Sequence, residues 1–243
     1  MLNLSFNKGK VVFIGDLHLS ADRPDINSAF DRFLANLEEI EALFIMGDLF
    51  EVWIGDDIAE PFALELANKL KKLSTQFPIY FTHGNRDFML GKRYAELSGM
   101  TLLEEDQTID LFGNKAVVLH GDSLCTLDEA YQKFRRFRNQ AWARAIYNAL
   151  PKMIRRRIAA NIRANSKAAN QGKTYEVMDV TPQAVTDKLQ QYQVQWLIHG
   201  HTHRPKVHTL ANLQKRFVVG DWYEQCSVLT IDKNGYQLST SPL

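Results

Sequence analysis

The sequence predicts an α/β fold that carries a helical insertion. Short apolar runs rich in Val, Ile and Phe alternate with segments whose apolar residues recur at helical spacing, a pattern typical of α/β domains. A long basic stretch at residues 131–173 interrupts this alternation and has helical character. We therefore expect one domain over residues 1–243, with an insertion at residues 128–175.

The expected strands are six short apolar runs whose length and composition suit buried strands. They cover residues 11–15, 42–46, 78–82, 115–119, 195–198 and 216–219. Three helices are expected to begin at Pro24, Pro61 and Pro182, because proline is favoured in the first turn of a helix. Their inward stripes are Phe30, Phe33, Leu34 and Leu37, then Phe62, Leu66, Leu70 and Leu73, then Val185, Leu189 and Tyr192.

The insertion concentrates positive charge. Residues 131–173 contain twelve Lys or Arg and no Asp or Glu, which leaves −11 for the rest of a chain whose formal net charge is +1. Its apolar residues lie at roughly helical spacing: Phe134, Phe137, Trp142, Ile146, Tyr147, Leu150, Ile154, Ile158 and Ile162. A basic amphipathic unit of this kind is expected to act as a lid or cap; the alternative is a helical face exposed to solvent.

Cysteine usage and hydropathy bear on where the protein works. Cys125 and Cys226 form no CxxC pair and are too few for a disulfide framework, so we expect a reducing compartment, the cytoplasm. The residues before the first strand are polar and lack a signal-peptide core. No run approaches the roughly 18 apolar residues of a membrane span, so we expect a soluble or peripheral protein.

Side chains of the metal-ligand type follow five of the six expected strands. They are Asp16 and His18, Asp48, Asn85, His120, and His199 with His201. In open α/β sheets, ligands bind beyond the carboxyl ends of the strands. Residues two apart on an extended segment point to the same side, so the Asp16–His18 and His199–His201 pairs can each chelate one centre.

The mixture of imidazole, carboxylate and carboxamide ligands suits Mn²⁺, Fe²⁺, Co²⁺ or Zn²⁺. A carboxylate such as Asp48 can bridge two cations about 3.5–4 Å apart, the separation used in two-metal phosphoryl chemistry. Taken alone, an Asp-x-His or Gly-Asp sequence after a strand is usually a turn or a helix cap. Five such elements in order, each at a strand end, predict a two-metal phosphoesterase.

The order Asp-x-His, Gly-Asp, Gly-Asn, His, Gly-His-x-His over residues 16–201 resembles the calcineurin-like metallophosphoesterase superfamily. The resemblance implies a sandwich of two mixed β-sheets flanked by helices. It also implies that one divalent cation is held by Asp16, His18, Asp48 and His201. The other would be held by Asp48, Asn85, His120 and His199, with Asp48 bridging.

The chain departs from the superfamily pattern at Arg86, where most members have His after the Gly-Asn pair, often assigned as a general acid. Arginine cannot give up a proton near neutral pH, so Arg86 cannot protonate a leaving group. A phosphate monoester of low pKa, as released from a pyrophosphate, needs no such help. Arg86 is then expected to bind phosphate oxygens; the alternative is a surface ion pair with Asp87.

Longer strings at residues 47–57, 83–93, 164–170 and 198–205 narrow the resemblance to the pyrophosphatases of lipid A biosynthesis that act on UDP-2,3-diacylglucosamine. The resemblance covers nearly the whole chain and implies attack of a metal-bound hydroxide on the α-phosphate, giving UMP and 2,3-diacylglucosamine 1-phosphate (lipid X), with two Mn²⁺ as cofactor. The catalytic residues would be Asp48, Asn85, Arg86, His120 and His199. The substrate contacts would be Asn85, Arg86, Asp128, Ser166, Asn170, Lys173 and His199.

For that substrate, the insertion would supply an apolar chamber for two acyl chains, and its basic face would meet anionic headgroups. We expect a monomer, bound peripherally to the cytoplasmic face of the bacterial inner membrane, with no nucleic-acid partner. The main alternative is a metal-dependent nuclease or cyclic-nucleotide phosphodiesterase of the same superfamily, with the basic insertion as a nucleic-acid groove. A non-enzymatic scaffold is a third alternative, although such members lose ligands and none is missing in this sequence.

Overall fold

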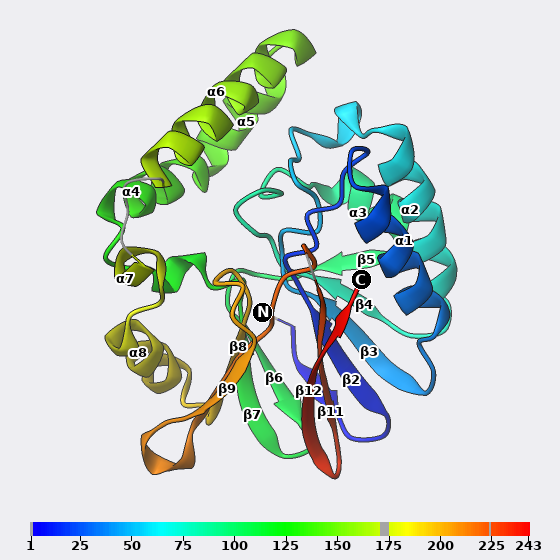
Figure 1. Cartoon of the computed structure of the whole chain (residues 1–243), viewed down its shortest axis with the longest axis vertical. Coiled ribbons are helices and arrows are strands. Elements are labelled where there is room, and N and C mark those ends of the chain that lie inside the picture. The colour runs from blue at the N-terminus through cyan, green and yellow to red at the C-terminus, as the bar shows by residue number, and fades with distance from the viewer. Residues whose placement is uncertain (1, 171–174, 224) are drawn as a thin grey trace.

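The computed structural model describes residues 2–170, 175–223 and 225–243, with side chains described outside 165–170 and 175–176. Two six-stranded sheets pack face to face, in the orders β12-β11-β2-β3-β4-β5 and β1-β6-β7-β8-β10-β9 (Figure 1). Both sheets contain parallel and antiparallel neighbours. The expected sandwich of two mixed sheets flanked by helices is confirmed.

The first sheet consists of β2 (Lys10–Ile14), β3 (Ile40–Ile45), β4 (Ile79–Phe81), β5 (Met100–Leu102), β11 (Gln225–Asp232) and β12 (Gly235–Pro242). The second consists of β1 (Leu4–Phe6), β6 (Gln107–Leu111), β7 (Asn114–Val118), β8 (Trp196–His199), β9 (Lys206–Thr209) and β10 (Lys215–Val218). All six predicted strands are present. The strands β1, β5, β6, β9, β11 and β12 have no counterpart among the predicted strands.

Helices cover the outer face of each sheet. The helices α1 (Pro24–Ala35), α2 (Pro61–Leu73) and α3 (Lys92–Ser98) flank the first sheet, and α8 (Pro182–Tyr192) packs on the second. The three predicted helix starts are correct, and α3 was missed. Thr181 caps α8 by accepting a hydrogen bond from the Ala184 N–H, a contact typically worth about 1 kcal/mol.

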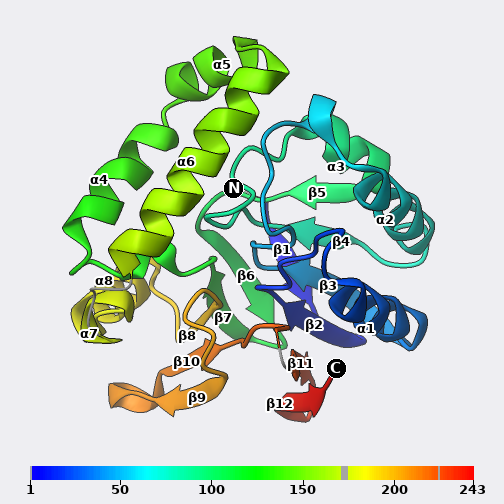
Figure 2. The ribbon, with the colours of Figure 1, turned by 45° about the horizontal axis from the view of Figure 1, so that its top comes forward.

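The insertion is helical, as predicted. It contains α4 (Glu129–Arg138), α5 (Ala141–Ala149) and α6 (Lys152–Asn170), followed by the short α7 (Tyr175–Met178). In Figure 2, α4 and α6 lie side by side with α5 at one end, and together they form an arm next to the sandwich. We call α4, α5 and α6 the cap. Within the described part of the chain, no helix combines the length and apolarity needed to cross a membrane.

The cap docks on the sandwich through its own positive charges. Six of its basic side chains bind carboxylates or carbonyl oxygens of the core loops: Arg135, Arg138, Arg144, Lys152, Arg155 and Arg163. Arg155 is buried and forms two hydrogen bonds with Asp57, at 2.8 and 2.6 Å. The alternative of a helical face exposed to solvent is therefore wrong for Arg155, whose charge is paired with Asp57 of the core.

Candidate metal centre

Five loops meet at one edge of the sandwich because the strands before them run parallel within each sheet. In the first sheet β2, β3 and β4 are parallel, and in the second β7 and β8 are parallel. Backbone hydrogen bonds continue past the strand ends, from the Asp16 N–H to the Gly47 carbonyl at 3.1 Å and from the Gly200 N–H to the His120 carbonyl at 2.8 Å. The His201 N–H donates to Asp16 Oδ2 at 2.7 Å and joins the loops of the two sheets.

Four of the predicted ligands have left-handed backbone conformations. The φ angles are 53° at Asp16, 52° at His18, 51° at Asp48 and 67° at His201. This conformation costs roughly 1–2 kcal/mol for a non-glycine residue, and such strain concentrates at functional sites. This backbone conformation makes the chain turn, so the four side chains point toward one centre and not along the direction of the strands.

Glycines provide the remaining space. A Cβ atom on Gly84 would lie 2.1 Å from Asp48 Oδ1, and one on Gly200 would lie 2.3 Å from Asp16 Oδ2. Gly47 adopts φ +83°, and a Cβ there would lie 2.5 Å from the Gly84 nitrogen. Any larger residue at these positions would displace a carboxylate or its supporting loop.

Asp48 lies between histidines contributed by the two sheets. Its Oδ2 atom is 3.9 Å from His18 Nε2 and 3.8 Å from His120 Nε2. Asp16, Asp48 and His120 are buried and close enough for one cation to reach an atom of each. This central position is the one that a bridging carboxylate requires.

Hydrogen bonds to backbone carbonyls fix the rings of His120 and His199. Because a carbonyl oxygen can only accept, His120 Nδ1–H donates to the Met46 carbonyl at 2.9 Å and His199 Nδ1–H donates to the Gly200 carbonyl at 2.8 Å. His199 Nε2 then carries a lone pair and has no hydrogen-bond partner among the described residues, while His120 Nε2 lies 3.1 Å from Asn85 Oδ1. Burial, aided by Arg216, lowers the pKa of His199 to about 3, and burial lowers that of His201 to about 4. Both rings are neutral at pH 7, as metal binding requires.

The residues fit a pair of divalent cations. Asp16 Oδ1, His18 Nε2 and His199 Nε2 are buried atoms without a hydrogen-bond partner in the described structure. Leaving a buried polar atom unpaired costs about 1–3 kcal/mol, so three such atoms around two buried carboxylates indicate a missing positive partner. Asn85 Oδ1 lies 3.1 Å from His120 Nε2, so the predicted amide ligand is also in place.

His203 and Asp221 also lie at the site. His203 Nε2 is 3.4 Å from Asp16 Oδ1, and Nδ1 is 3.4 Å from Asp221 Oδ2. Burial opposes a charge on His203, but Asp16 and Asp221 together raise its pKa to about 10. The alternation of His199, His201 and His203 along the chain is the sequence signal that points to His203.

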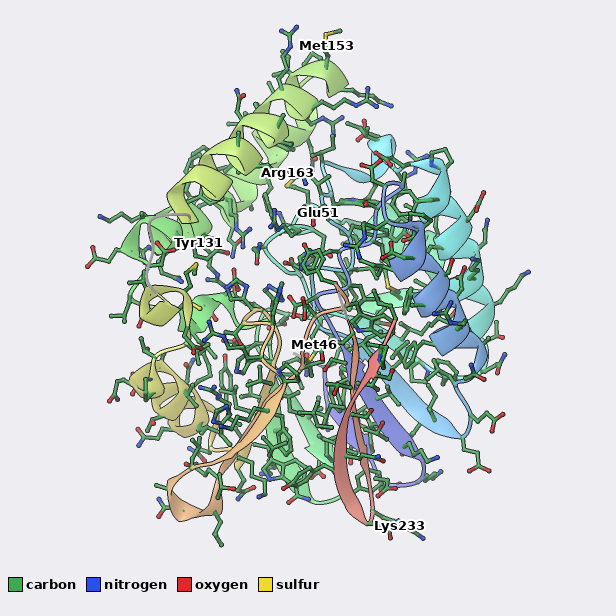
Figure 3. All side chains as sticks on the ribbon, viewed as in Figure 1. Met46, Glu51, Tyr131, Met153, Arg163 and Lys233 are labelled. Atoms are coloured by element: carbon green, nitrogen blue, oxygen red, sulfur yellow. The ribbon has the colours of Figure 1, made fainter. Side chains whose placement is uncertain are left out.

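Glu51 is a second residue that the sequence did not single out. Its carboxylate lies 3.2 Å from His18 Nδ1, 2.6 Å from Arg163 Nη2 and 3.2 Å from the Tyr223 hydroxyl. Figure 3 shows Arg163 of the cap directly above Glu51. Burial would raise the pKa of Glu51, but His18 and its arginine neighbours lower it to about 2. Glu51 thus connects the metal centre to α6.

Arg86 and Asp87 point in different directions. Asp87 is fully buried and accepts backbone hydrogen bonds from Gly84 and Leu49 at 2.8 Å and from Asp48 at 3.3 Å, so it braces the ligand loops. The Arg86 N–H donates to Asp48 Oδ1 at 2.8 Å, while Nη1 lies 3.8 Å from Glu51. The alternative of an Arg86–Asp87 surface pair is wrong, because Asp87 is held by the main chain.

Asp122 connects the loop after β7 to the cap. Its Oδ2 accepts hydrogen bonds from Tyr131, Arg135 and Arg138, at 2.5, 2.9 and 2.9 Å. Burial opposes its charge, but Arg138 and Arg135 outweigh that effect and hold the pKa of Asp122 well below its usual range. Arg138 also donates to the Asn85 carbonyl at 2.9 Å, so one cap residue contacts the loops of two predicted ligands.

Four predicted substrate contacts belong to the cap and its flanks. Asp128 is the N-cap of α4, where its side chain accepts a hydrogen bond from the Tyr131 N–H at 3.2 Å. The side chains of Ser166 and Asn170, and Lys173 as a whole, lie outside the described residues. Their assignment stays a prediction.

A family model described as calcineurin-like phosphoesterase matches residues 9–205, and this range contains every predicted ligand. The chain belongs to the calcineurin-like phosphoesterases. It is a metal-dependent hydrolase, which excludes the non-enzymatic scaffold considered above.

This phosphoesterase has relatives that are similar over nearly their full length. The UDP-2,3-diacylglucosamine hydrolase of Shewanella loihica is 61% identical over 232 residues, covering 95% of this chain and 96% of the relative. That of Shewanella oneidensis is 58% identical over 234 residues, covering 96% and 98%. Through them the phosphoesterase belongs to the UDP-2,3-diacylglucosamine hydrolase family, as the longer motifs predicted. A solved archaeal phosphodiesterase is similar at a TM-score of 0.48 with 13% identity, covering 96% of this chain and 99% of its own.

Proposed function

We propose that this phosphoesterase hydrolyses the pyrophosphate bond of UDP-2,3-diacylglucosamine to UMP and 2,3-diacylglucosamine 1-phosphate in lipid A biosynthesis, with two Mn²⁺ ions. The observation that carries the proposal is the convergence of seven ligand-type side chains from both sheets, next to a helical cap, in a chain 61% identical to a hydrolase of that name. Asp16, His18, Asp48 and His201 would hold one cation. Asp48, Asn85, His120 and His199 would hold the other.

When bound, two such cations ionise a water molecule and neutralise negative charge on the attacked phosphate. The chain's own residues keep the ligands in place for this chemistry. Asp87 holds the main chain of Asp48 and Leu49, and Arg138 holds the carbonyl of Asn85. Supporting groups of this kind typically change metal affinity or activity by 10- to 100-fold.

Arg86 is placed to bind the pyrophosphate. Its main chain is fixed against Asp48, while its guanidinium group is partly exposed and only 3.8 Å from Glu51, a loose pair that a phosphate can replace. A guanidinium binds phosphate oxygens with two parallel hydrogen bonds but supplies no proton at neutral pH. The leaving group must therefore depart as an anion, as lipid 1-phosphate does when water attacks the α-phosphate.

The cap is proposed to bind the lipid half of the substrate. Asp128, Ser166, Asn170 and Lys173 would contact the sugar and its phosphate, together with Asn85, Arg86 and His199. Large apolar side chains are exposed along the cap, whereas side chains of this kind are usually buried. Among them are Phe137, Trp142, Ile146, Met153 and Ile154. Acyl chains, or the membrane from which they are drawn, would cover them.

The same surface supports the proposed peripheral contact with the cytoplasmic face of the bacterial inner membrane. Lys133, Arg136, Arg156 and Arg157 are exposed on the cap and have no ion-pair partner among the described residues. Each basic side chain near an anionic bilayer contributes about 1 kcal/mol. Six basic residues of the cap are bound to loops of the core, so fewer positive charges remain for a nucleic-acid groove than the sequence suggested. This disfavours the nuclease alternative.

The test is an assay of chelator-treated protein with UDP-2,3-diacylglucosamine, with and without added Mn²⁺, in ¹⁸O-labelled water. We expect Mn²⁺-dependent release of UMP that carries the ¹⁸O label, because the label marks the phosphorus that water attacks. Label in the lipid 1-phosphate would refute attack on the α-phosphate. Faster turnover of single-stranded DNA or a cyclic nucleotide than of the UDP-lipid would favour the alternative function.

A further inference from the structure

A polar cavity adjoins the predicted metal ligands. It is open, has a volume of about 900 Å³ and is lined by Arg23, His203, Asp221, Tyr223 and Gln225. These residues come from the segment before α1, the loop after β8 and the segment from β10 to β11. The cap contacts the loops after β3, β4 and β7. Glu51, which follows β3, binds both Arg163 of the cap and the hydroxyl of the cavity residue Tyr223, so the cap and the cavity both adjoin the ligand set.

We propose that this cavity binds the nucleoside half of the substrate. The proposal rests on the proposed function, which places the lipid half under the cap and the pyrophosphate at the ligand set. His203 supplies the connection, because Nε2 is 3.4 Å from Asp16 Oδ1 and Nδ1 is 3.4 Å from Asp221. An α-phosphate held at the metal centre would thus have its ribose at the mouth of the cavity.

The lining residues are chemically suited to a pyrimidine nucleoside. The Gln225 carboxamide is only half-buried and has no side-chain hydrogen-bond partner in the described part of the chain. Its carbonyl and NH₂ groups match the N–H and carbonyl groups of the uracil imide edge. Asp221 has a carboxylate that can accept hydrogen bonds from ribose hydroxyls. Together, the carboxamide and the carboxylate can recognise both a base and a sugar. A pocket that bound only phosphate would not need these two groups.

Tyr223 and Arg23 form the walls and are held in place. The Tyr223 ring stacks on His18 with centroids 4.9 Å apart, and its hydroxyl donates to Glu51 at 3.2 Å. Arg23 binds Asp25 through Nε and Nη2 and donates to the Tyr223 carbonyl at 2.9 Å. A prearranged wall lowers the entropy lost when a nucleoside is bound.

A second cavity does not meet these conditions. It has a volume of about 210 Å³ and is lined by Asp56, Asp57, Met89, Gly91, Arg93 and Asn148. Its carboxylates already bind Arg155 and the backbone of Gly91 and Tyr94. It has no contact with a predicted metal ligand, so its exposed Arg93 is a suitable control position.

The experiment compares Gln225→Ala and Arg23→Lys with the control Arg93→Ala in the manganese-loaded full chain. For each protein, inhibition of UDP-2,3-diacylglucosamine hydrolysis is measured separately with UMP and with 2,3-diacylglucosamine 1-phosphate. We expect Gln225→Ala to weaken inhibition by UMP about 10-fold, the effect of losing one to two hydrogen bonds, and inhibition by the lipid product less than 2-fold. Arg23→Lys should act in the same direction, and Arg93→Ala should change neither constant.

Unchanged inhibition by UMP in Gln225→Ala, or equal weakening by both products, would overturn the proposal, since the cavity would then have no selective role. A wild-type protein that does not hydrolyse the UDP-lipid would refute the proposed function instead. In that case, calorimetric binding of UMP to the manganese-loaded wild type and Gln225→Ala still tests the cavity: a 10-fold difference supports it, and equal affinity refutes it.

Discussion

Asp48 combines a central carboxylate with a left-handed backbone, and this restricts how it can be replaced. Asparagine tolerates φ near 51° better than alanine does, so Asp48→Asn removes the charge with less backbone strain. We predict that Asp48→Asn lowers hydrolysis by more than about 100-fold, beyond the loss typical of groups that only support ligands. Activity assays and manganese counting by elemental analysis would measure both effects.

Asp187→Asn, on the exposed side of α8, is the matched control and should retain activity and metal. His120→Ala should behave like Asp48→Asn, because the ring contacts both Asp48 and Asn85. Full activity with two bound manganese ions in either ligand variant would contradict the site assignment.

Sequence order was enough to predict that seven ligand-type side chains gather at one edge of the sandwich, because each follows a recognisable strand end and parallel strands end at a common edge. It was not enough for Glu51, Asp122 or Asp221. These residues become important through contacts with Arg163, Arg138 and His203, which are distant in the chain or belong to another loop. Their roles depend on how the cap and the loops pack, which no local pattern expresses.

At the scale of elements, α6 is tethered to the sandwich by Arg155, which binds Asp57 and the Ile54 carbonyl. We predict that Arg155→Met lowers the free energy of unfolding by about 1–2 kcal/mol, as expected for charge-assisted hydrogen bonds near the surface. It should also raise the KM for the lipid substrate, since the cap is held less firmly. Denaturant unfolding and steady-state kinetics would show these changes, and the adjacent exposed Arg156→Met is the control.

The same tether predicts a pH dependence. The hydrogen bonds from Arg155 lower the pKa of Asp57 below its ordinary value, so the folded state binds the proton less tightly than the unfolded state. This stabilisation is complete above the ordinary aspartate pKa, near 4, and is lost as the pH falls through the folded pKa. The difference in unfolding free energy between wild type and Arg155→Met should therefore be constant from pH 7 to about pH 5 and shrink below pH 4; a constant difference down to pH 3 would contradict it.

The exposed apolar residues of α5 predict a contact with lipid. Trp142 and Ile146 are 56% and 58% exposed. Replacing both by Gln should weaken binding to anionic phospholipid vesicles and raise the KM for the lipid substrate several-fold, because the apolar area that enters the bilayer or contacts acyl chains is lost. Leu97→Gln on α3, which changes a residue that is 46% exposed, should leave vesicle binding unchanged. Equal vesicle binding by all three proteins would refute the membrane contact.

The strands that the sequence did not predict share a physical reason. The edge strand β12 is largely exposed, and β5 is only three residues long, so neither carries a continuous apolar run. Neighbouring strands supply their hydrogen bonds, and this pairing decides their conformation. The strands β2, β3 and β8 are buried over most of their length and were predicted because burial requires the apolar run that the sequence displays. The interior strands β6 and β11 bury only alternate residues, so they carry no such run and were not predicted.

For the whole molecule, the buried carboxylates make stability depend on bound metal. Removing the cations leaves Asp16 and Asp48 buried beside polar atoms without partners. A ligand at 100 times its dissociation constant stabilises the native state by about 2.7 kcal/mol, which corresponds to roughly 5–10 °C in Tm for a chain of this size. We predict a fall of that order in Tm on treatment with a chelator, reversed by Mn²⁺ in calorimetry; an unchanged Tm would contradict the metal centre.

The His201–Asp16 and His120–Met46 hydrogen bonds have a further consequence, because they join the loops of two sheets whose facing surfaces pack through apolar side chains. Each cation would draw on groups from both halves, so small sliding of one sheet across the other would disassemble the centre while every strand stayed intact. Manganese affinity therefore reports how well the two sheets are aligned with each other. A substitution in the core between the sheets, such as Phe44→Leu, removes the ring that stacks on Phe13. It should weaken manganese binding before any loss of secondary structure is visible by circular dichroism.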